Sequence, residues 1–247
     1  EQNQYYVDKT MYLPLLENQP SNIIFIRPRR FGKSIFLSML HAYYDCSKKK
    51  KFQTLFGDLW VGKHPTPLQG RYQVLHLDFS YVGGSIDKLE ENFDMYLRVK
   101  LDGFMRIYQE FYLTDFKEKF FKTDSATEKL ALLQDETATK SIPLYLIIDE
   151  YDNFTNTVLN EQGEKVYWAI THADGFYRDV FKKFKGMFER IFITGVSPVT
   201  LDDVTSGFNI GWHISTKPEF NQMLGFSMEE VRKMFAYYKE VGGIPAT

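Results

Sequence analysis

The strongest constraint on the fold is a short apolar run that leads into a basic loop and then into an amphipathic segment. Residues 23–26 are continuously apolar and mostly β-branched, as expected for a strand that is covered on both faces. The loop of residues 27–34 follows without a break, and apolar residues then recur at helical spacing from 35 to 44. The sequence therefore predicts a buried strand, a basic loop and a helix in immediate succession.

The end of this loop matches a phosphate-binding pattern. Gly32, Lys33 and Ser34 fit the last three positions of G-x-x-x-x-G-K-[ST], whereas Arg27 stands where the first glycine is expected. Backbone N–H groups around Gly32 and the positive end of the helix would hold phosphate oxygens, Lys33 would reach the β- and γ-phosphates, and the Ser34 hydroxyl would bind Mg²⁺. Arg27 and Pro28 weaken the match, because arginine lacks the conformational freedom of glycine and proline has no N–H to donate. The flanking strand and helix favour a phosphate site over a basic turn without a ligand.

Three more apolar runs of strand length lie further along the chain, at residues 74–79, 144–148 and 191–194. Between them, apolar residues follow helical spacing, most clearly over residues 89–108 and 177–188. Strands that alternate with helices predict an α/β fold, with a mostly parallel central sheet and helices on both of its faces. Ser227 and Glu230 form a capping box, which predicts the start of a last helix.

Two of these predicted strands end in residues that could act on a phosphate. Asp149 and Glu150 follow the run at 144–148, so Asp149 is expected to hold Mg²⁺ and Glu150 to orient and deprotonate an attacking water. Thr194 ends the run at 191–194, which is expected to lie between the loop strand and the acidic strand. Its hydroxyl would contact the γ-phosphate or the water, or else bond to the backbone of a turn. The carboxyl ends of parallel strands meet at one edge of a sheet, where ligands of such sheets bind.

Arginine and aromatic side chains surround the loop. Arg29 and Arg30 flank it and could stabilise the triphosphate charge, or pair with Asp149 or Asp152 when no nucleotide is bound. Tyr5, Tyr6 and Tyr12 precede the first strand and could stack on a base or simply pack. The predicted catalytic residues are Lys33, Glu150 and Thr194, and the predicted metal ligands are Ser34 and Asp149. The predicted ATP-binding residues are Arg29, Arg30, Phe31, Gly32, Lys33, Ser34 and Ile35.

Composition excludes several other classes of protein. The 30 Lys and Arg residues against 32 Asp and Glu give a net charge of −2, whereas strong binding to a nucleic-acid backbone needs a clustered basic surface. A single cysteine, Cys46, excludes a disulfide scaffold and favours a reducing, cytoplasmic environment. No stretch approaches the roughly 18 apolar residues of a membrane span, so no membrane association is expected.

Seven short blocks make the sequence resemble a known family. The blocks are residues 6–10, 27–34, 77–80, 148–152, 192–198, 202–209 and 224–226. In this order they resemble the bacterial AAA-ATPase-like family, a group of P-loop ATPases often joined to a C-terminal PD-(D/E)XK-type nuclease domain. An arginine at the first loop position is part of that family's pattern, so Arg27 does not by itself indicate an inactive site.

The resemblance implies a P-loop NTPase three-layer sandwich of the additional-strand, AAA-like class. Residues 1–220 would form the ATPase core, and residues 221–247 would begin a helical lid. ATP and Mg²⁺ are the implied cofactors, and the domain would act as a nucleotide switch for an effector domain elsewhere on the full-length chain. Self-association of the chain is possible on this resemblance and is left open. No PD…(D/E)-x-K constellation is present, so nuclease activity is not assigned to these residues, and any nucleic-acid contact is expected only through the effector domain.

Two alternatives remain at this point. The first is a regulatory or interaction module that binds nucleotide without hydrolysing it, which Arg27 and Pro28 favour. The second is a nucleic-acid-processing module, which the near-neutral charge argues against. No guanine-reading N-K-x-D motif occurs, which favours ATP over GTP.

Overall fold

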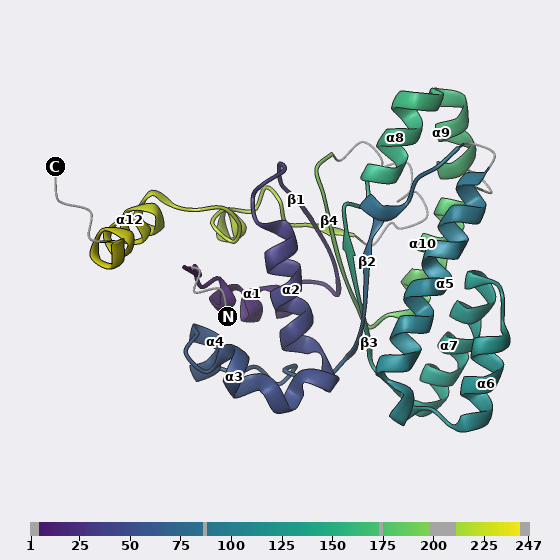
Figure 1. The fold of residues 1–247 in the computed structure, drawn as a ribbon, viewed down its shortest axis with the longest axis horizontal. Coiled ribbons are helices and arrows are strands. Elements are labelled where there is room, and N and C mark those ends of the chain that lie inside the picture. Colours follow the sequence, from purple (N-terminus) through teal and green to yellow (C-terminus); the bar gives the residue numbers. More distant parts are fainter. Residues whose placement is uncertain (1–4, 86–87, 173–174, 198–210, 243–247) are drawn as a thin grey trace.

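The computed structural model describes residues 5–85, 88–172, 175–197 and 211–242, and its centre is a parallel five-stranded sheet (Figure 1). The spatial order is β2-β3-β4-β1-β5, and every neighbouring pair is parallel. The predicted α/β fold with a parallel sheet is confirmed, and β4 lies between the loop strand β1 and the acidic strand β3, as expected. The strands are β1 (Asn22–Ile26), β2 (Gln73–Asp78), β3 (Leu144–Asp149), β4 (Arg190–Gly195) and β5 (Trp212–His213).

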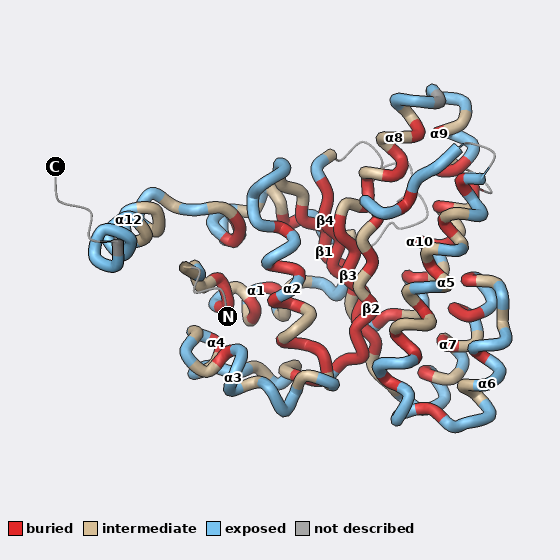
Figure 2. The backbone as a smooth tube through the Cα atoms, in the orientation of Figure 1, coloured by how far each residue is buried: buried red, intermediate tan, exposed pale blue. Residues whose placement is uncertain are grey.

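Helices cover both faces of this sheet. In Figure 1, α2 (Lys33–Tyr44) lies on one face, while α5 (Leu89–Ile107), α7 (Ala126–Lys140) and α10 (Phe176–Met187) lie on the other. Alternate residues of a strand point to opposite faces, so Phe25 of β1 packs in the cluster with α2, and its neighbour Ile24 packs in the cluster with α5 and α10. Both clusters are buried (Figure 2), which explains why the strand sequences are continuously apolar.

The remaining helical elements complete the described chain. They are η1 (Thr10–Tyr12), α1 (Leu13–Glu17), η2 (Cys46–Lys51), α3 (Phe52–Phe56), α4 (Trp60–Lys63), η3 (Phe79–Tyr81), η5 (Gln109–Phe111), α6 (Thr114–Lys122), α8 (Asn153–Gln162), α9 (Glu164–Thr171), η6 (Pro218–Phe220) and α12 (Met228–Gly242). None of the helices within the described ranges combines the length and the apolar character that crossing a bilayer would require.

Two tyrosines bond to the edge strand β2, Tyr96 from within α5 and Tyr108 from just after its last residue. The backbone N–H of Val74 donates to the hydroxyl of Tyr108 (2.9 Å), and that of Asp78 donates to the hydroxyl of Tyr96 (2.7 Å). These bonds occupy donors that an exposed edge would offer to another strand. They also fix the end of β2, where Asp78 is in register with Asp149 of β3.

The C-terminal part contains one strand that the sequence did not predict and one helix that it did. β5 has only two residues and pairs with β1. The predicted capping box is confirmed at the start of α12, because the N–H of Glu230 donates to Ser227 Oγ (3.2 Å) and the N–H of Ser227 donates to Glu230 Oε2 (2.7 Å). Of the seven sequence blocks, residue 198 and residues 202–209 lie outside the described residues.

Candidate functional site

The loop between β1 and α2 contains two residues with left-handed backbone. Gly32 precedes the first turn of α2 at φ +84°, and Arg30 has φ +66°. A Cβ added to Gly32 would meet no atom within 4 Å, so the glycine is required by its backbone conformation and not by crowding. The space beside Gly32 at the helix N-terminus is open, as a ligand that contacts this backbone would need.

Lys33 is the first residue of α2, and its side chain folds back across the loop. Its Nζ donates to the carbonyl oxygens of Arg27 and Pro28, at 3.1 Å each, and the residue is only 6% exposed. Within the described residues, no carboxylate forms an ion pair with this ammonium. The loop therefore holds a buried positive charge that is bound only to neutral carbonyls.

Arg27, which replaces the first glycine of the pattern, bonds to the end of β1 and to the segment after β5. Its guanidinium donates to the carbonyls of Ile26 (3.0 Å) and Ser215 (2.7 Å), and it lies 4.4 Å from the centre of the Phe25 ring. The hydroxyl of Ser215 in turn accepts the N–H of Ile26 (2.8 Å). Arg27 thus ties the end of β1 to the segment after β5.

The loop and the ends of β3 and β4 meet at Asp149. Ser34 Oγ donates to Asp149 Oδ2 (2.7 Å), and Thr194 Oγ1 donates to Asp149 Oδ1 (2.9 Å). Asp149 is 3% exposed and belongs to β3, while Thr194 belongs to β4. The expectation that loop and acidic strand end adjoin is confirmed, and the Thr194 hydroxyl bonds to a carboxylate instead of a turn backbone. The roles of these side chains remain predictions.

Glu150, the next residue, has a left-handed backbone with φ +49°. Two hydrogen bonds of the next residue stabilise this strained backbone. The N–H of Tyr151 donates to the carbonyl of Thr194 (3.2 Å), and the hydroxyl of Tyr151 donates to the carbonyl of Ser197. The Glu150 carboxylate is partly exposed at this turn. Burial and the negative charges of Asp149 and Asp78 raise its pKa, against the opposing effect of Lys33 and Arg29. A carboxylate with a raised pKa beside a buried cation can act as a general base.

Asp152 fixes the turn that follows β4. Its carboxylate accepts the N–H of Val196 (3.1 Å) and the N–H of Ser197 (2.7 Å). A Cβ on Gly195 would come within 2.4 Å of Asp152 Oδ1, so this position requires glycine because of close approach. The Asp152 carboxylate is therefore bound to backbone. Neither Asp149 nor Asp152 forms an ion pair with Arg29 or Arg30 in the described parts of the chain.

A pocket of about 550 Å³ opens beside the loop. Its walls are residues 5–7 and 9 of the N-terminal segment, residues 30–32, 35 and 36 of the loop and α2, and residues 223–226 before α12. Phe31 is 43% exposed and Ile35 is 66% exposed, so the loop presents apolar side chains where the pocket begins. Arg30 lines this pocket, whereas Arg29 lies near enough to Glu150 to lower that residue's pKa.

The sequence predicted only part of this pocket. Tyr5 and Tyr6 line it, but Tyr12 does not, and the wall at 223–226 was not among the predicted site residues. Gly225 joins that wall to the loop, because its N–H donates to the carbonyl of Phe31 (3.0 Å) and its φ is +78°. The only sequence signal for this wall was the block at residues 224–226.

Comparisons with known proteins identify the family of the chain. Among solved structures, the chain is similar to Cdc6p from Pyrobaculum aerophilum, with 12% sequence identity and a TM-score of 0.38. The similarity covers 92% of this chain but only 46% of that one, and the TM-score is too low to support a conclusion about this chain. Among curated proteins, none matches. A family model described as "Predicted AAA-ATPase" matches residues 1–205 of the 247. By this match, the chain belongs to the AAA-ATPase-like family.

Proposed function

We propose that this chain binds Mg·ATP at the loop and hydrolyses it. The observation that carries the proposal is the Ser34–Asp149 hydrogen bond, since it joins a phosphate-binding loop to an acidic strand end. Lys33 and Glu150 lie next to the two bonded residues in the sequence and provide the cation and the base. The family match supports ATP binding in general, and the residue roles below are our proposal.

The nucleotide would lie across the N-terminus of α2. Its phosphates would contact the backbone at Gly32, where the helix dipole favours negative charge, and the Lys33 ammonium. Its base would enter the pocket beside Phe31 and Ile35, whose apolar surface suits a flat aromatic ligand. Arg30 lines that pocket, so we assign it to the base side of the nucleotide, and we assign Arg29 to the γ-phosphate side.

The donor atoms beside the loop suit Mg²⁺. Within the described residues, no group of three or more His, Cys, Asp or Glu side chains could form a metal cage. Mg²⁺ needs no such cage, because it commonly takes one or two protein oxygens and completes its shell with phosphate and water. The Ser34 hydroxyl and the Asp149 carboxylate are such oxygens, already 2.7 Å apart. Bound there, Mg²⁺ would neutralise charge on the phosphate oxygens.

The chemical step follows from the remaining side chains. Glu150 accepts a proton from water, the water oxygen forms a bond to the γ-phosphorus, and the bond from that phosphorus to the bridging oxygen of ADP breaks. Lys33 and Arg29 stabilise the negative charge on the transferred group. Thr194, now bonded to Asp149, would exchange that bond for one to the γ-phosphate and so respond to its presence.

Phosphate release from the purified protein tests this proposal directly. We expect ATP-dependent release of phosphate in the presence of Mg²⁺ and loss of it when Mg²⁺ is chelated, because without the cation the Asp149 carboxylate repels the triphosphate and the charge on the phosphate oxygens is not neutralised. Binding of ATP without any phosphate release would favour the regulatory module instead. Arg27 does not have a positive φ, so its position does not need the conformational freedom of glycine, and this removes one reason for preferring that alternative.

The rate should also fall in acid with a midpoint above the ordinary glutamate pKa. Only the deprotonated form of Glu150 can accept a proton, so raising its pKa moves the acid limb of kcat/KM to higher pH. Asp78→Asn removes one of the charges that raise this pKa, and we expect the limb to shift toward lower pH. A pH–rate profile of both proteins measures this, and coincident acid limbs would contradict the assignment.

We further propose that residues 1–220 form the ATPase core and that residues 221–247 begin a lid which responds to nucleotide. Such a switch would control an effector domain, such as a nuclease, on a longer chain in the cytoplasm. Support for the lid comes from Gly225, whose N–H bonds directly to the phosphate loop just before α12.

A further inference from the structure

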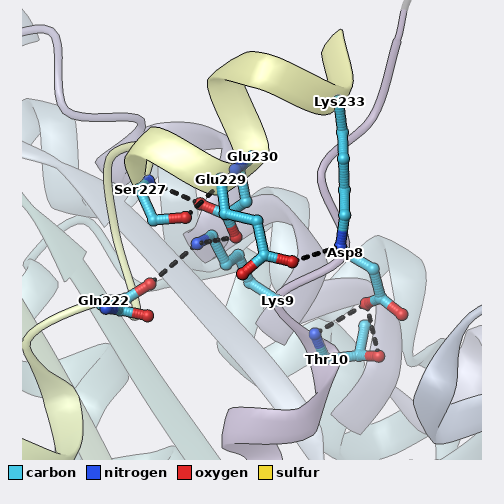
Figure 3. A network of polar contacts seen from close by, with 8 residues as sticks. All are labelled: Asp8, Lys9, Thr10, Gln222, Ser227, Glu229, Glu230 and Lys233. Carbon is cyan, nitrogen blue, oxygen red and sulfur yellow. Dashed lines mark hydrogen bonds and ion pairs between the residues drawn. The ribbon is translucent and has the colours of Figure 1, made fainter. Parts of the chain in front are cut away.

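Lys9 joins the two ends of the described chain. Its Nζ donates to Glu230 Oε1 (2.6 Å) and to the carbonyl of Gln222 (2.8 Å), as Figure 3 shows. The side chains of Lys9 and Glu230 are 11% and 25% exposed, so this ion pair is partly shielded from water. An ion pair that is partly buried and hydrogen-bonded stabilises the fold more than an exposed one, because an exposed pair adds little to the free energy of unfolding.

The same glutamate also begins α12. Glu230 Oε2 accepts the N–H of Ser227, while Oε1 accepts from Lys9. Burial alone would raise the pKa of Glu230, but the bonds from Lys9 and Ser227 outweigh it and keep the pKa below the usual range, so the carboxylate is charged at neutral pH. The direction of α12 at its first turn is thus tied to the position of the Lys9 ammonium.

On its other side, the N-terminal segment is fixed to the core. Asp8 Oδ1 accepts both the N–H and the hydroxyl of Thr10, at 2.8 and 2.6 Å, and Asp8 Oδ2 accepts the N–H of Trp60 in α4 (2.7 Å). The hydroxyl of Thr10 accepts the N–H of Val61 (3.1 Å). Lys9 therefore extends from an anchored segment, and a movement of α12 would strain or break its bonds.

The partners of Lys9 also connect two walls of the pocket. Lys9 itself lines the pocket, and Gln222 immediately precedes the wall at residues 223–226. The Lys9–Glu230 pair and the Lys9–Gln222 bond therefore hold the wall at residues 5–7 and 9 against the wall at 223–226. Without them, the second wall would be held to the loop through Gly225.

We propose that the Lys9–Glu230 ion pair keeps the pocket closed around the nucleotide base, with Glu230 as a positioning residue for base binding. This inference rests on the proposed function and deepens it, because it assigns control of the base half of the site to α12. Coupling of this kind is reciprocal: the pair strengthens base binding, and a bound base strengthens the pair. The position of α12 then depends on whether the base site is filled.

The test compares two ligands and two matched variants. Glu230→Gln removes the charge but keeps an oxygen that can accept the Ser227 N–H, so the capping box can persist. Glu229→Gln is the control, since it makes the same change one residue earlier on α12, in an exposed pair with Lys233 (2.7 Å, 76% and 67% exposed) that Figure 3 also shows. Calorimetry with Mg²⁺ measures the affinity for ATP and for inorganic tripolyphosphate, which has no base.

We expect Glu230→Gln to weaken ATP binding about fivefold to tenfold. The same variant should change tripolyphosphate binding by less than about twofold, and Glu229→Gln should change neither ligand by more than that. Equal weakening of both ligands by Glu230→Gln would overturn the inference, because it would indicate general damage, and so would an unchanged affinity for ATP. If the unmodified protein bound neither ATP nor tripolyphosphate, the proposed function itself would fail, and this result is distinguishable from failure of the inference about Glu230.

Substitutions of Lys9 give a second, independent test of the role of the Lys9–Glu230 pair. Lys9→Met should reproduce the loss of ATP affinity, and Lys9→Arg should retain most of the affinity, because arginine keeps the charge and the donors. A Lys9→Met protein that binds ATP as tightly as the unmodified chain would also overturn the inference.

Discussion

Glu150→Gln is expected to reduce ATP turnover by at least about 100-fold, and up to about 10⁴-fold, while leaving the affinity for Mg·ATP within about threefold. The amide has nearly the shape of the carboxylate but cannot accept a proton from water. Glu150 already has φ +49°, and glutamine at this position meets the same backbone strain, so the turn should persist. Single-turnover phosphate release gives the first quantity, and calorimetry gives the second.

A matched control separates the chemistry from a general effect of charge. Glu161 is an exposed acid near the end of α8, the helix that follows the same turn, and Glu161→Gln should leave turnover unchanged. Glu150→Gln should also bind ATP without consuming it. A variant that hydrolysed ATP at the normal rate would remove Glu150 from its role as the base.

The sheet could be predicted from sequence because each long strand is buried on both faces. Ile23, Ile24 and Phe25 divide between two apolar clusters, and this leaves a continuous apolar run that is easy to recognise. β5 gave no such signal, because it has two residues, Trp212 and His213, that are both exposed. It forms by pairing with β1, which no local pattern encodes.

The meeting of Ser34, Asp149 and Thr194 was also predictable, since the carboxyl ends of neighbouring parallel strands must lie at one edge. The orientation of Arg27 was not predictable. As a replacement for glycine it weakened the match to the phosphate-binding pattern, but the direction of its side chain depends on Ser215, 188 positions further along the chain. Side-chain contacts over such separations leave no trace in periodicity or motif spacing.

The pocket beside the loop shows the same limit. The capping box at Ser227 and Glu230 predicted where α12 begins, because that interaction is local. It did not predict that Glu230 also binds Lys9, which is 221 residues away. Local chemistry therefore fixed where the helix begins, and a tertiary contact fixed the position of its first turn relative to Lys9.

Lys33→Ala should weaken binding of both ATP and tripolyphosphate by at least about 100-fold, or about 3 kcal/mol, because the buried ammonium is the main charge available to the phosphates. The substitution also leaves the carbonyls of Arg27 and Pro28 without their donor, so the loop loses order together with charge. Lys33→Met loses the same charge and donor but retains the apolar stem, so it should bind as weakly as Lys33→Ala, and Lys63→Ala, at an exposed lysine of α4, is the control that should bind normally. Calorimetry with the two ligands measures the losses.

The pattern across ligands distinguishes the two halves of the site. Loss of Lys33 should weaken binding of a phosphate ligand with or without a base, whereas loss of the Glu230 charge should weaken only the ligand that carries a base. Adenosine, which has no phosphate, should lose much less affinity for the Lys33→Ala protein than ATP does, because it does not contact the ammonium and is affected only through the loop residues 30–32 that line the pocket. If Lys33→Ala bound tripolyphosphate normally, the triphosphate could not lie along this loop, and the proposed roles of Ser34, Asp149 and Glu150 would fail with it.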